Sequence, residues 1–128
     1  MAVKFKVIEK GQPGVPEGGV KKFYASTQSS GEMTLGKLTK SIEMMSTVSG
    51  ADIRAVLYAL VEVIKMSLAD GQIVRLAELG SLRISLASIG EDSAENVTSR
   101  SVKGARTVFA PGTELKEMLK NLKYQKVV

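Results

Sequence analysis

The pattern of apolar residues is most regular between residues 51 and 69, where they recur at helical spacing over more than one face. The apolar residues of this pattern are Ile53, Val56, Leu57, Leu60, Val61, Ile64 and Leu68. A surface helix of a monomer needs only one narrow apolar stripe. We therefore predict a helix that is either central or pressed against a second chain. Because few other residues are available to surround it, we favour a dimer interface.

A shorter helical pattern precedes this segment. Leu38, Ile42 and Met45 follow one another at helical spacing and form a single apolar stripe. Thr34 is suited to cap the first turn, because its hydroxyl can accept a hydrogen bond from a free backbone N–H. We predict this helix over about residues 35–46.

Three strands are predicted after the long helix. Gly71 is suited to end that helix, because glycine adopts the left-handed conformation without steric cost. Alternating or β-branched residues predict strands at residues 73–76, 82–86 and 97–109. The polar, acidic segment at residues 87–96 is predicted as a loop. Pro111-Gly112 then breaks the third strand, and a last helix is predicted directly after it.

Residues 1–32 carry a different pattern. Residues 3–10 alternate apolar and charged side chains as in a half-exposed strand, and residues 20–27 have strand composition. The nine residues Gly11–Gly19 hold four Gly and two Pro and are predicted as a loop. A lone hairpin is barely stable in water, so this extension should pack on another part of the protein. We divide the chain into this strand–loop–strand extension and a main α+β domain at residues 33–128.

Composition removes several classes of chemistry. The 128 residues include no Cys and no His, so thiolate or imidazole nucleophiles, bases and metal ligands are missing. No pair of carboxylates lies in an apolar context, and no phosphate-binding glycine motif is present. Glu91, Asp92 and Glu95 could hold a hard cation, but a solvated turn is the simpler interpretation. We predict a protein that is not an enzyme and has no cofactor, metal site or small-molecule substrate.

Targeting signals are also missing from the sequence. The first residues lack the apolar stretch of a signal peptide, and no run reaches the length of a membrane span. We therefore expect a cytoplasmic protein.

The net charge of +5 is unevenly distributed. Three acidic residues give residues 91–97 a charge of −3, whereas seven basic and two acidic residues give residues 98–128 a charge of +5. The candidate phosphate-binding groups are Arg83, Arg100, Lys103, Arg106, Lys116, Lys120, Lys123 and the backbone N–H at Gly112. If residues 82–88 and 100–109 pair as antiparallel strands, the first four can line a ribbon that follows a DNA groove. The alternative is a solvated sheet edge, which Lys and Arg commonly protect.

Two motifs resemble the HU/IHF family of bacterial histone-like DNA-binding proteins. Residues 71–82, Gly-Gln-Ile-Val-Arg-Leu-Ala-Glu-Leu-Gly-Ser-Leu, are similar to the family's helix-to-sheet run that ends Gly-Phe-Gly-Thr/Ser-Phe, with Leu79 and Leu82 in place of the two Phe. Residues 109–116, Phe-Ala-Pro-Gly-Thr-Glu-Leu-Lys, match the family's Phe-x-Pro-Gly-x-x-Leu-Lys run before the last helix. The resemblance covers about residues 33–124. Longer HU-like proteins with added segments occur in the Bacteroides group, and this chain resembles one.

The resemblance implies two helices, a three-stranded sheet whose last two strands extend as an arm, and a C-terminal helix. It implies an intertwined homodimer that binds double-stranded DNA, largely independently of sequence, as an architectural protein of the bacterial nucleoid. The expected dimer interface includes Ile53, Leu57, Leu60, Ile64 and Phe109.

The chain also departs from the family pattern. The family's arm carries an Arg-Asn-Pro-x-Thr-Gly run whose Pro wedges between base steps. This chain has no Pro between residues 17 and 110, and the expected arm tip at residues 88–96 is acidic. The alternative function is therefore an HU-fold protein-interaction or structural module with weak or no DNA binding.

Overall fold

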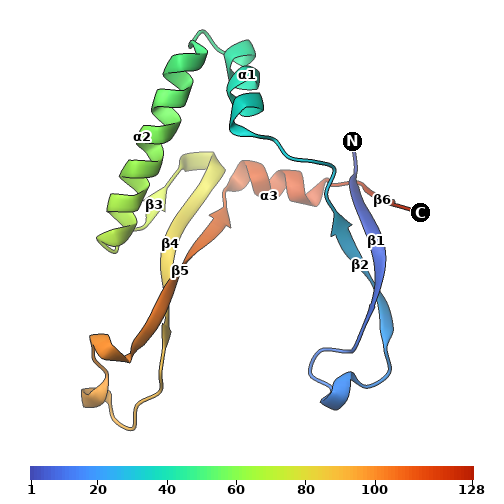
Figure 1. Cartoon of the computed structure of the whole chain (residues 1–128), viewed down its shortest axis with the longest axis vertical. Coiled ribbons are helices and arrows are strands. Elements are labelled where there is room, and N and C mark those ends of the chain that lie inside the picture. The colour runs from blue at the N-terminus through green and yellow to red at the C-terminus, as the bar shows by residue number, and fades with distance from the viewer. The chain divides into compact units, whose positions relative to one another are not determined.

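The computed structural model describes all residues 1–128 as three α-helices and two three-stranded sheets (Figure 1). The chain divides into two compact units. One comprises residues 1–38 together with residues 119–128, and the other comprises residues 39–118. Each unit contains one of the sheets. This mixture of helices and small sheets confirms the predicted α+β class.

The two predicted helices are present as α1, Leu35–Met45, and α2, Gly50–Ala69. Ser49 caps α2, since its hydroxyl accepts a hydrogen bond from the backbone N–H of Asp52 at 3.3 Å. Gly71 follows the end of α2 with a φ of 80°, the left-handed conformation predicted for it. Local capping chemistry thus fixes both ends of the longest helix.

Strands β3, β4 and β5 form an antiparallel sheet in that order and span Val74–Arg75, Gly80–Ser88 and Val102–Pro111. Strands β4 and β5 extend away from α2 as a long ribbon (Figure 1). The predicted start of the third strand at residue 97 is wrong. Residues 97–101 instead belong to the ribbon's tip, where two short 3₁₀ helices span Ala94–Asn96 and Ser99–Ser101.

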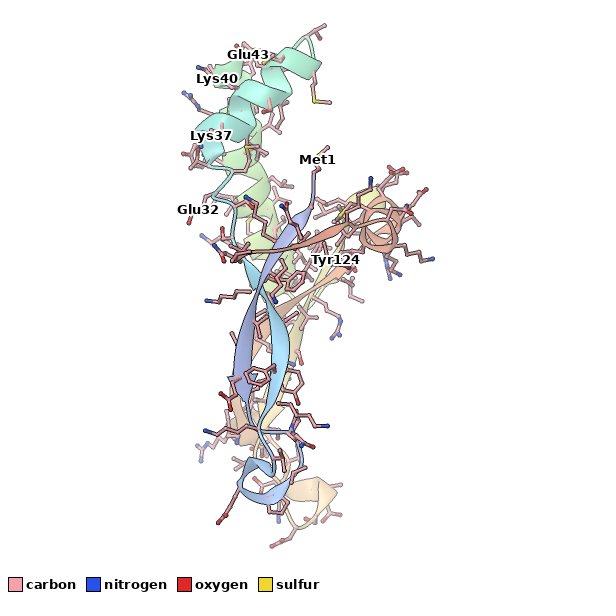
Figure 2. The ribbon with its side chains drawn as sticks, turned by 90° about the vertical axis from the view of Figure 1, so that its right-hand side faces the viewer. Met1, Glu32, Lys37, Lys40, Glu43 and Tyr124 are labelled. Carbon is pink, nitrogen blue, oxygen red and sulfur yellow. The ribbon has the colours of Figure 1, made fainter.

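The other sheet contains the N-terminal hairpin, formed by β1, Val3–Lys10, and β2, Lys22–Gln28. A 3₁₀ helix at Pro16–Gly18 interrupts the connecting loop. After α3, Thr113–Lys120, the strand β6, Tyr124–Lys126, pairs in parallel with β1. The sequence did not predict β6. Figure 2 shows this sheet with its side chains, including Tyr124.

Few apolar side chains are buried within the single chain. Ile53 and Leu68, both in α2, are the only buried apolar residues, at 5% and 8% exposure. Large apolar side chains are left exposed in each unit, with Phe23 at 71% in one and Leu86 at 63% in the other. None of the helices is long and apolar enough to span a membrane.

Candidate nucleic-acid interface

The register of the β3–β4–β5 sheet places three arginines on one face. Arg83 of β4 lies opposite Val108, and Arg106 of β5 lies opposite Ser85 two positions along. Arg75 of β3 lies opposite Ser81. Because side chains alternate between faces with a period of two, these pairings bring Arg75, Arg83 and Arg106 to the same side. We call this side the arginine face.

The remaining residues of the arginine face leave the guanidinium groups accessible. All three arginines are exposed, and none forms an ion pair within the chain. Between them lie mainly small side chains, Ser81, Ser85, Ala87, Gly104 and Ala110, with Val108 as the one larger apolar residue. A guanidinium on such a surface can form two parallel hydrogen bonds to a phosphate.

The opposite face of the same sheet is apolar. Its larger apolar residues are Val74, Leu82, Ile84, Leu86 and Phe109, and Ala105 and Thr107 lie among them. Leu86 and Phe109 remain 63% and 46% exposed. The sheet therefore has one cationic and one apolar side. If protein covers the apolar side, the arginine face remains exposed to solvent.

Two predicted basic residues lie near the tip of the ribbon. Lys103 occupies an irregularity of the ladder, because Ala87 pairs with Gly104 whereas Ser88 pairs with Val102. Lys103 and Arg106 line a common hollow on the ribbon. Arg100 was predicted to line a strand, but it lies in the 3₁₀ helix of the tip and is exposed there.

The predicted lysines of the last helix lie on or directly after α3, and none of them is in a strand of the ribbon. Lys116 and Lys120 are exposed one turn apart on α3, which places them on the same side of that helix. Lys123 follows α3, and its carbonyl accepts a hydrogen bond from the backbone N–H of Val3 at 2.8 Å. Lys120 and Lys123 belong to the unit that contains the N-terminal hairpin, whereas Lys116 belongs to the unit of the ribbon.

A family model described as "HU domain fused to wHTH, Ig, or Glycine-rich motif", HU-HIG, matches residues 1–126. The chain belongs to this HU-HIG family. The predicted HU-like character is thereby confirmed at the level of the family, and the match includes the N-terminal hairpin as well as the ribbon.

The fold of this chain is similar to that of a solved structure. The HU-HIG chain is similar to a candidate bacterial DNA-binding protein from Bacteroides vulgatus ATCC 8482, with a TM-score of 0.66 and 10% sequence identity. The similarity covers 99% of this chain and 49% of the other, so this chain spans about half the length of that protein. A comparison with curated proteins finds no match.

Gly112 of this HU-HIG chain has a packing role. Its N–H donates a hydrogen bond to the Leu79 carbonyl at 2.9 Å. A Cβ at this position would overlap the backbone carbonyl of Glu78. The Gly112 N–H is therefore not available for the phosphate contact predicted from the sequence. Its glycine is required because the start of α3 lies against the turn before β4.

The predicted dimer-interface residues differ in exposure. Ile53 is already buried inside the protomer, and Leu57 and Ile64 are half-buried. Leu60 and Phe109 are 38% and 46% exposed. Val56 and Val63 lie one turn on either side of Leu60 and are 63% and 54% exposed, so they extend its apolar strip. These two were not among the predicted interface residues.

The tip of the ribbon depends on a residue that the sequence analysis missed. Ser101 is 1% exposed, and its hydroxyl oxygen accepts a hydrogen bond from the backbone N–H of Thr98 at 3.1 Å. The Thr98 hydroxyl in turn accepts from the N–H of Arg100 at 3.3 Å. The Thr98-x-x-Ser101 spacing is the signal that could have identified this capping box. The tip's acidic residues form no cluster that could hold a metal ion.

Proposed function

We propose that this HU-HIG protein binds double-stranded DNA through the arginine face of its β3–β4–β5 sheet. The observation that carries the proposal is the placement of Arg75, Arg83 and Arg106 on one exposed side of a two-sided sheet. The family and the structural relative support it, because HU-like folds are those of DNA-binding proteins, which are generally not enzymes.

The mechanism is neutralisation of phosphates. Each arginine that meets a phosphate releases condensed counterions, and this release supplies most of the free energy of non-specific binding. Ser81 and Ser85 lie between the arginines and can donate hydrogen bonds to phosphate oxygens. The face contains no Asn or Gln to read adenine edges, and the proposal assigns its arginines to phosphates rather than to guanine edges. We therefore expect binding that varies little with base sequence, as an architectural protein of the bacterial nucleoid requires.

We further propose that the binding species is a homodimer. The exposed apolar strip around Leu60 and the exposed Leu86 and Phe109 support a second copy that covers α2 and the apolar side of the sheet. In that arrangement the dimer carries a net charge of +10, twice the +5 of one chain. Two arginine faces would then be available to one duplex.

A second candidate function is a protein-interaction module that retained the fold without DNA binding. The observation that favours it is the acidic ribbon tip, where Glu91, Asp92 and Glu95 would repel phosphates. The tip also lacks a Pro that could wedge between base steps. On this alternative the arginine face is a solvated surface.

The decisive experiment is a gel-shift series with duplex, nicked and cruciform DNA, repeated between about 50 and 200 mM salt. The proposal predicts binding to all three substrates, with an affinity that falls steeply as salt rises. Tighter binding to nicked and cruciform DNA than to intact duplex would support an architectural role, because these substrates cost less to bend. No shift at about 50 mM salt would favour the protein-interaction module.

A further inference from the structure

The N-terminal hairpin has a basic side of its own, in addition to the arginine face of the β3–β4–β5 sheet. The register of β1 with β2 places Lys4, Lys6, Lys10 and Lys22 on one face of the sheet. All four are exposed. The opposite face is largely apolar and includes Val3, Phe5, Val7, Phe23 and Tyr124. The hairpin is therefore a second two-sided sheet, and we call its lysine-bearing side the hairpin lysine face.

The charge of the hairpin lysine face is not compensated within the chain. Lys10 and Lys22 lie directly opposite each other, an arrangement that destabilises an antiparallel pair when both side chains are charged. Glu9, the one acidic residue of the two strands, points to the opposite face by alternation. None of the four lysines forms an ion pair. An external polyanion would relieve this repulsion.

The dimensions of the face fit a nucleic-acid backbone. Residues on the same side of a strand recur every 7 Å or so, and the line from Lys4 to Lys10 therefore extends about 20 Å. One strand of B-DNA presents about six phosphates over that length of helix axis. Ser26 and Gln28 lie opposite Lys6 and Lys4 and add hydrogen-bond donors suited to phosphate oxygens.

An aromatic side chain contacts a lysine at one end of the hairpin lysine face. Tyr24 lies on the same face, and the Lys10 ammonium is 5.0 Å from the centroid of its ring. Such a cation–π contact orients the lysine without neutralising its charge. The side chains of this sheet are drawn in Figure 2.

We propose that the hairpin lysine face is a second DNA-binding surface, which contacts the phosphate backbone independently of the arginine face. The inference rests on the proposed DNA binding for the identity of the polyanion. Because the contacts are to phosphates, this surface adds affinity and salt dependence and no base specificity. This proposal assigns a function to the N-terminal extension at residues 1–32. That extension lies outside the two helices, arm and C-terminal helix of the HU/IHF pattern.

The test compares two quadruple variants with the same net charge. One carries Lys4→Gln, Lys6→Gln, Lys10→Gln and Lys22→Gln. The control carries Lys21→Gln, Lys37→Gln, Lys40→Gln and Lys126→Gln, four lysines that are also exposed. Lys21 directly precedes β2, Lys37 and Lys40 lie in α1, and Lys126 lies on the opposite face of the hairpin sheet. Both variants reduce the net charge from +5 to +1. Circular dichroism and thermal melting establish that each variant is folded.

Salt titrations of duplex binding separate the outcomes. The hairpin variant should bind at least about tenfold more weakly than the control, with a slope of log K against log salt that is shallower by about 3 to 4 for each protomer whose four lysines contact the duplex. Equal behaviour of the two variants overturns the inference, whereas the proposed function stands if the wild type still binds. No duplex binding by the wild type at about 50 mM salt overturns both. Binding only to vesicles that contain phosphatidylserine would identify a membrane surface as the partner and also overturn both.

A proximity measurement adds a readout that does not depend on affinity. The chain has no Cys, so a single introduced Cys can carry a short photo-activated cross-linker. Gln28→Cys places the label on the hairpin lysine face, and Thr27→Cys places it on the opposite face one residue away. The inference predicts cross-links to DNA at least about fivefold more frequent from residue 28 than from residue 27. Equal yields from the two positions would contradict it.

Discussion

Ser101 donates a hydrogen bond from its buried hydroxyl to the Glu91 carboxylate at 3.0 Å. This bond ties the first acidic residue of the ribbon tip to the residue that precedes β5. The Ser101 carbonyl also accepts from the N–H of Ile89 at 2.9 Å, so the tip is closed by backbone and side-chain bonds together. Glu91 therefore has a structural partner, which distinguishes it from Asp92 and Glu95.

Removing the Ser101 hydroxyl should loosen the tip without unfolding the protein. Ser101→Ala leaves the Thr98 N–H and the Glu91 carboxylate without their partner, and the loss of such bonds costs about 1–3 kcal/mol locally. Hydrogen exchange at residues 89–101 should accelerate, while exchange in α2 stays unchanged. Ser99→Ala is the control, because that serine is exposed in the same 3₁₀ helix. Equal exchange in the two variants would show that the hydroxyl does not hold the tip.

Neutralising the two other tip carboxylates tests whether the tip approaches DNA. Asp92→Asn with Glu95→Gln removes two negative charges and leaves the Ser101–Glu91 bond in place. If the tip lies near phosphates, duplex affinity should rise severalfold at low salt, because like-charge repulsion is removed. The control is Glu62→Gln with Asp70→Asn, which changes the net charge equally, within α2 and at the residue that follows it. Equal affinities of the two double variants would show that the tip points away from DNA.

Gly112→Ala should destabilise the fold. A Cβ at this position overlaps the Glu78 carbonyl, and relieving such an overlap typically costs about 1–3 kcal/mol. Gly104→Ala in the neighbouring β5 is the control, because no atom lies within 4 Å of a Cβ there. Denaturant unfolding should show the loss for Gly112→Ala alone. Equal stability of both variants would contradict the close packing between α3 and the turn before β4.

The proposed dimer predicts unfolding that depends on protein concentration, because association stabilises only the folded state. Leu60→Asp would place an unpaired charge in the exposed apolar strip of α2 and should shift sedimentation toward monomers or unfolded chains. Arg54→Asp introduces the same carboxylate at another exposed position of α2 and should leave the dimer intact. A folded wild-type monomer at micromolar concentration would refute the dimer.

The helices were predictable from the sequence because their signals are local. Thr34, Ser49 and Gly71 mark helix ends by their own hydrogen bonds or conformational freedom, and the structure places α1 and α2 within a residue of the predicted bounds. The strand β6 was not predictable, because three residues are too few to show a periodic pattern. Its pairing with β1 joins the two ends of the chain, and such long-range pairing leaves no local signature.

The candidate site was only partly predictable for the same reason. Arg83 and Arg106 were identified as ribbon residues, but their shared face follows from a register that composition does not fix. Arg75 was missed although the strand that contains it was predicted, because its place on the same face as Arg83 depends on the register of β3 with β4. Arg100 was misplaced, since residues 97–101 have strand composition but are held in the tip by the Thr98–Ser101 capping box. This local capping arrangement overrides the β propensity of Val97.

The arginine face should set the salt dependence of DNA binding. If the arginine faces and their neighbouring cations neutralise six to eight phosphates per dimer, they contribute a slope of roughly −5 to −7 to the fall of log K against log salt. Arg83→Ala with Arg106→Ala removes four of these contacts from a dimer and should make the slope shallower by about 3 to 4. The affinity loss should be the same for duplexes of different sequence, because the contacts are to phosphates.

The matched control for this measurement is Arg54→Ala with Lys37→Ala, which removes two exposed cations per chain from α2 and α1. It should change the slope by less than about 1, because only long-range electrostatics are altered. A loss confined to particular base sequences would indicate direct readout by Arg83 or Arg106 and contradict phosphate binding. A slope unchanged by the arginine variant but reduced by the control would assign DNA binding to the helices instead of the ribbon.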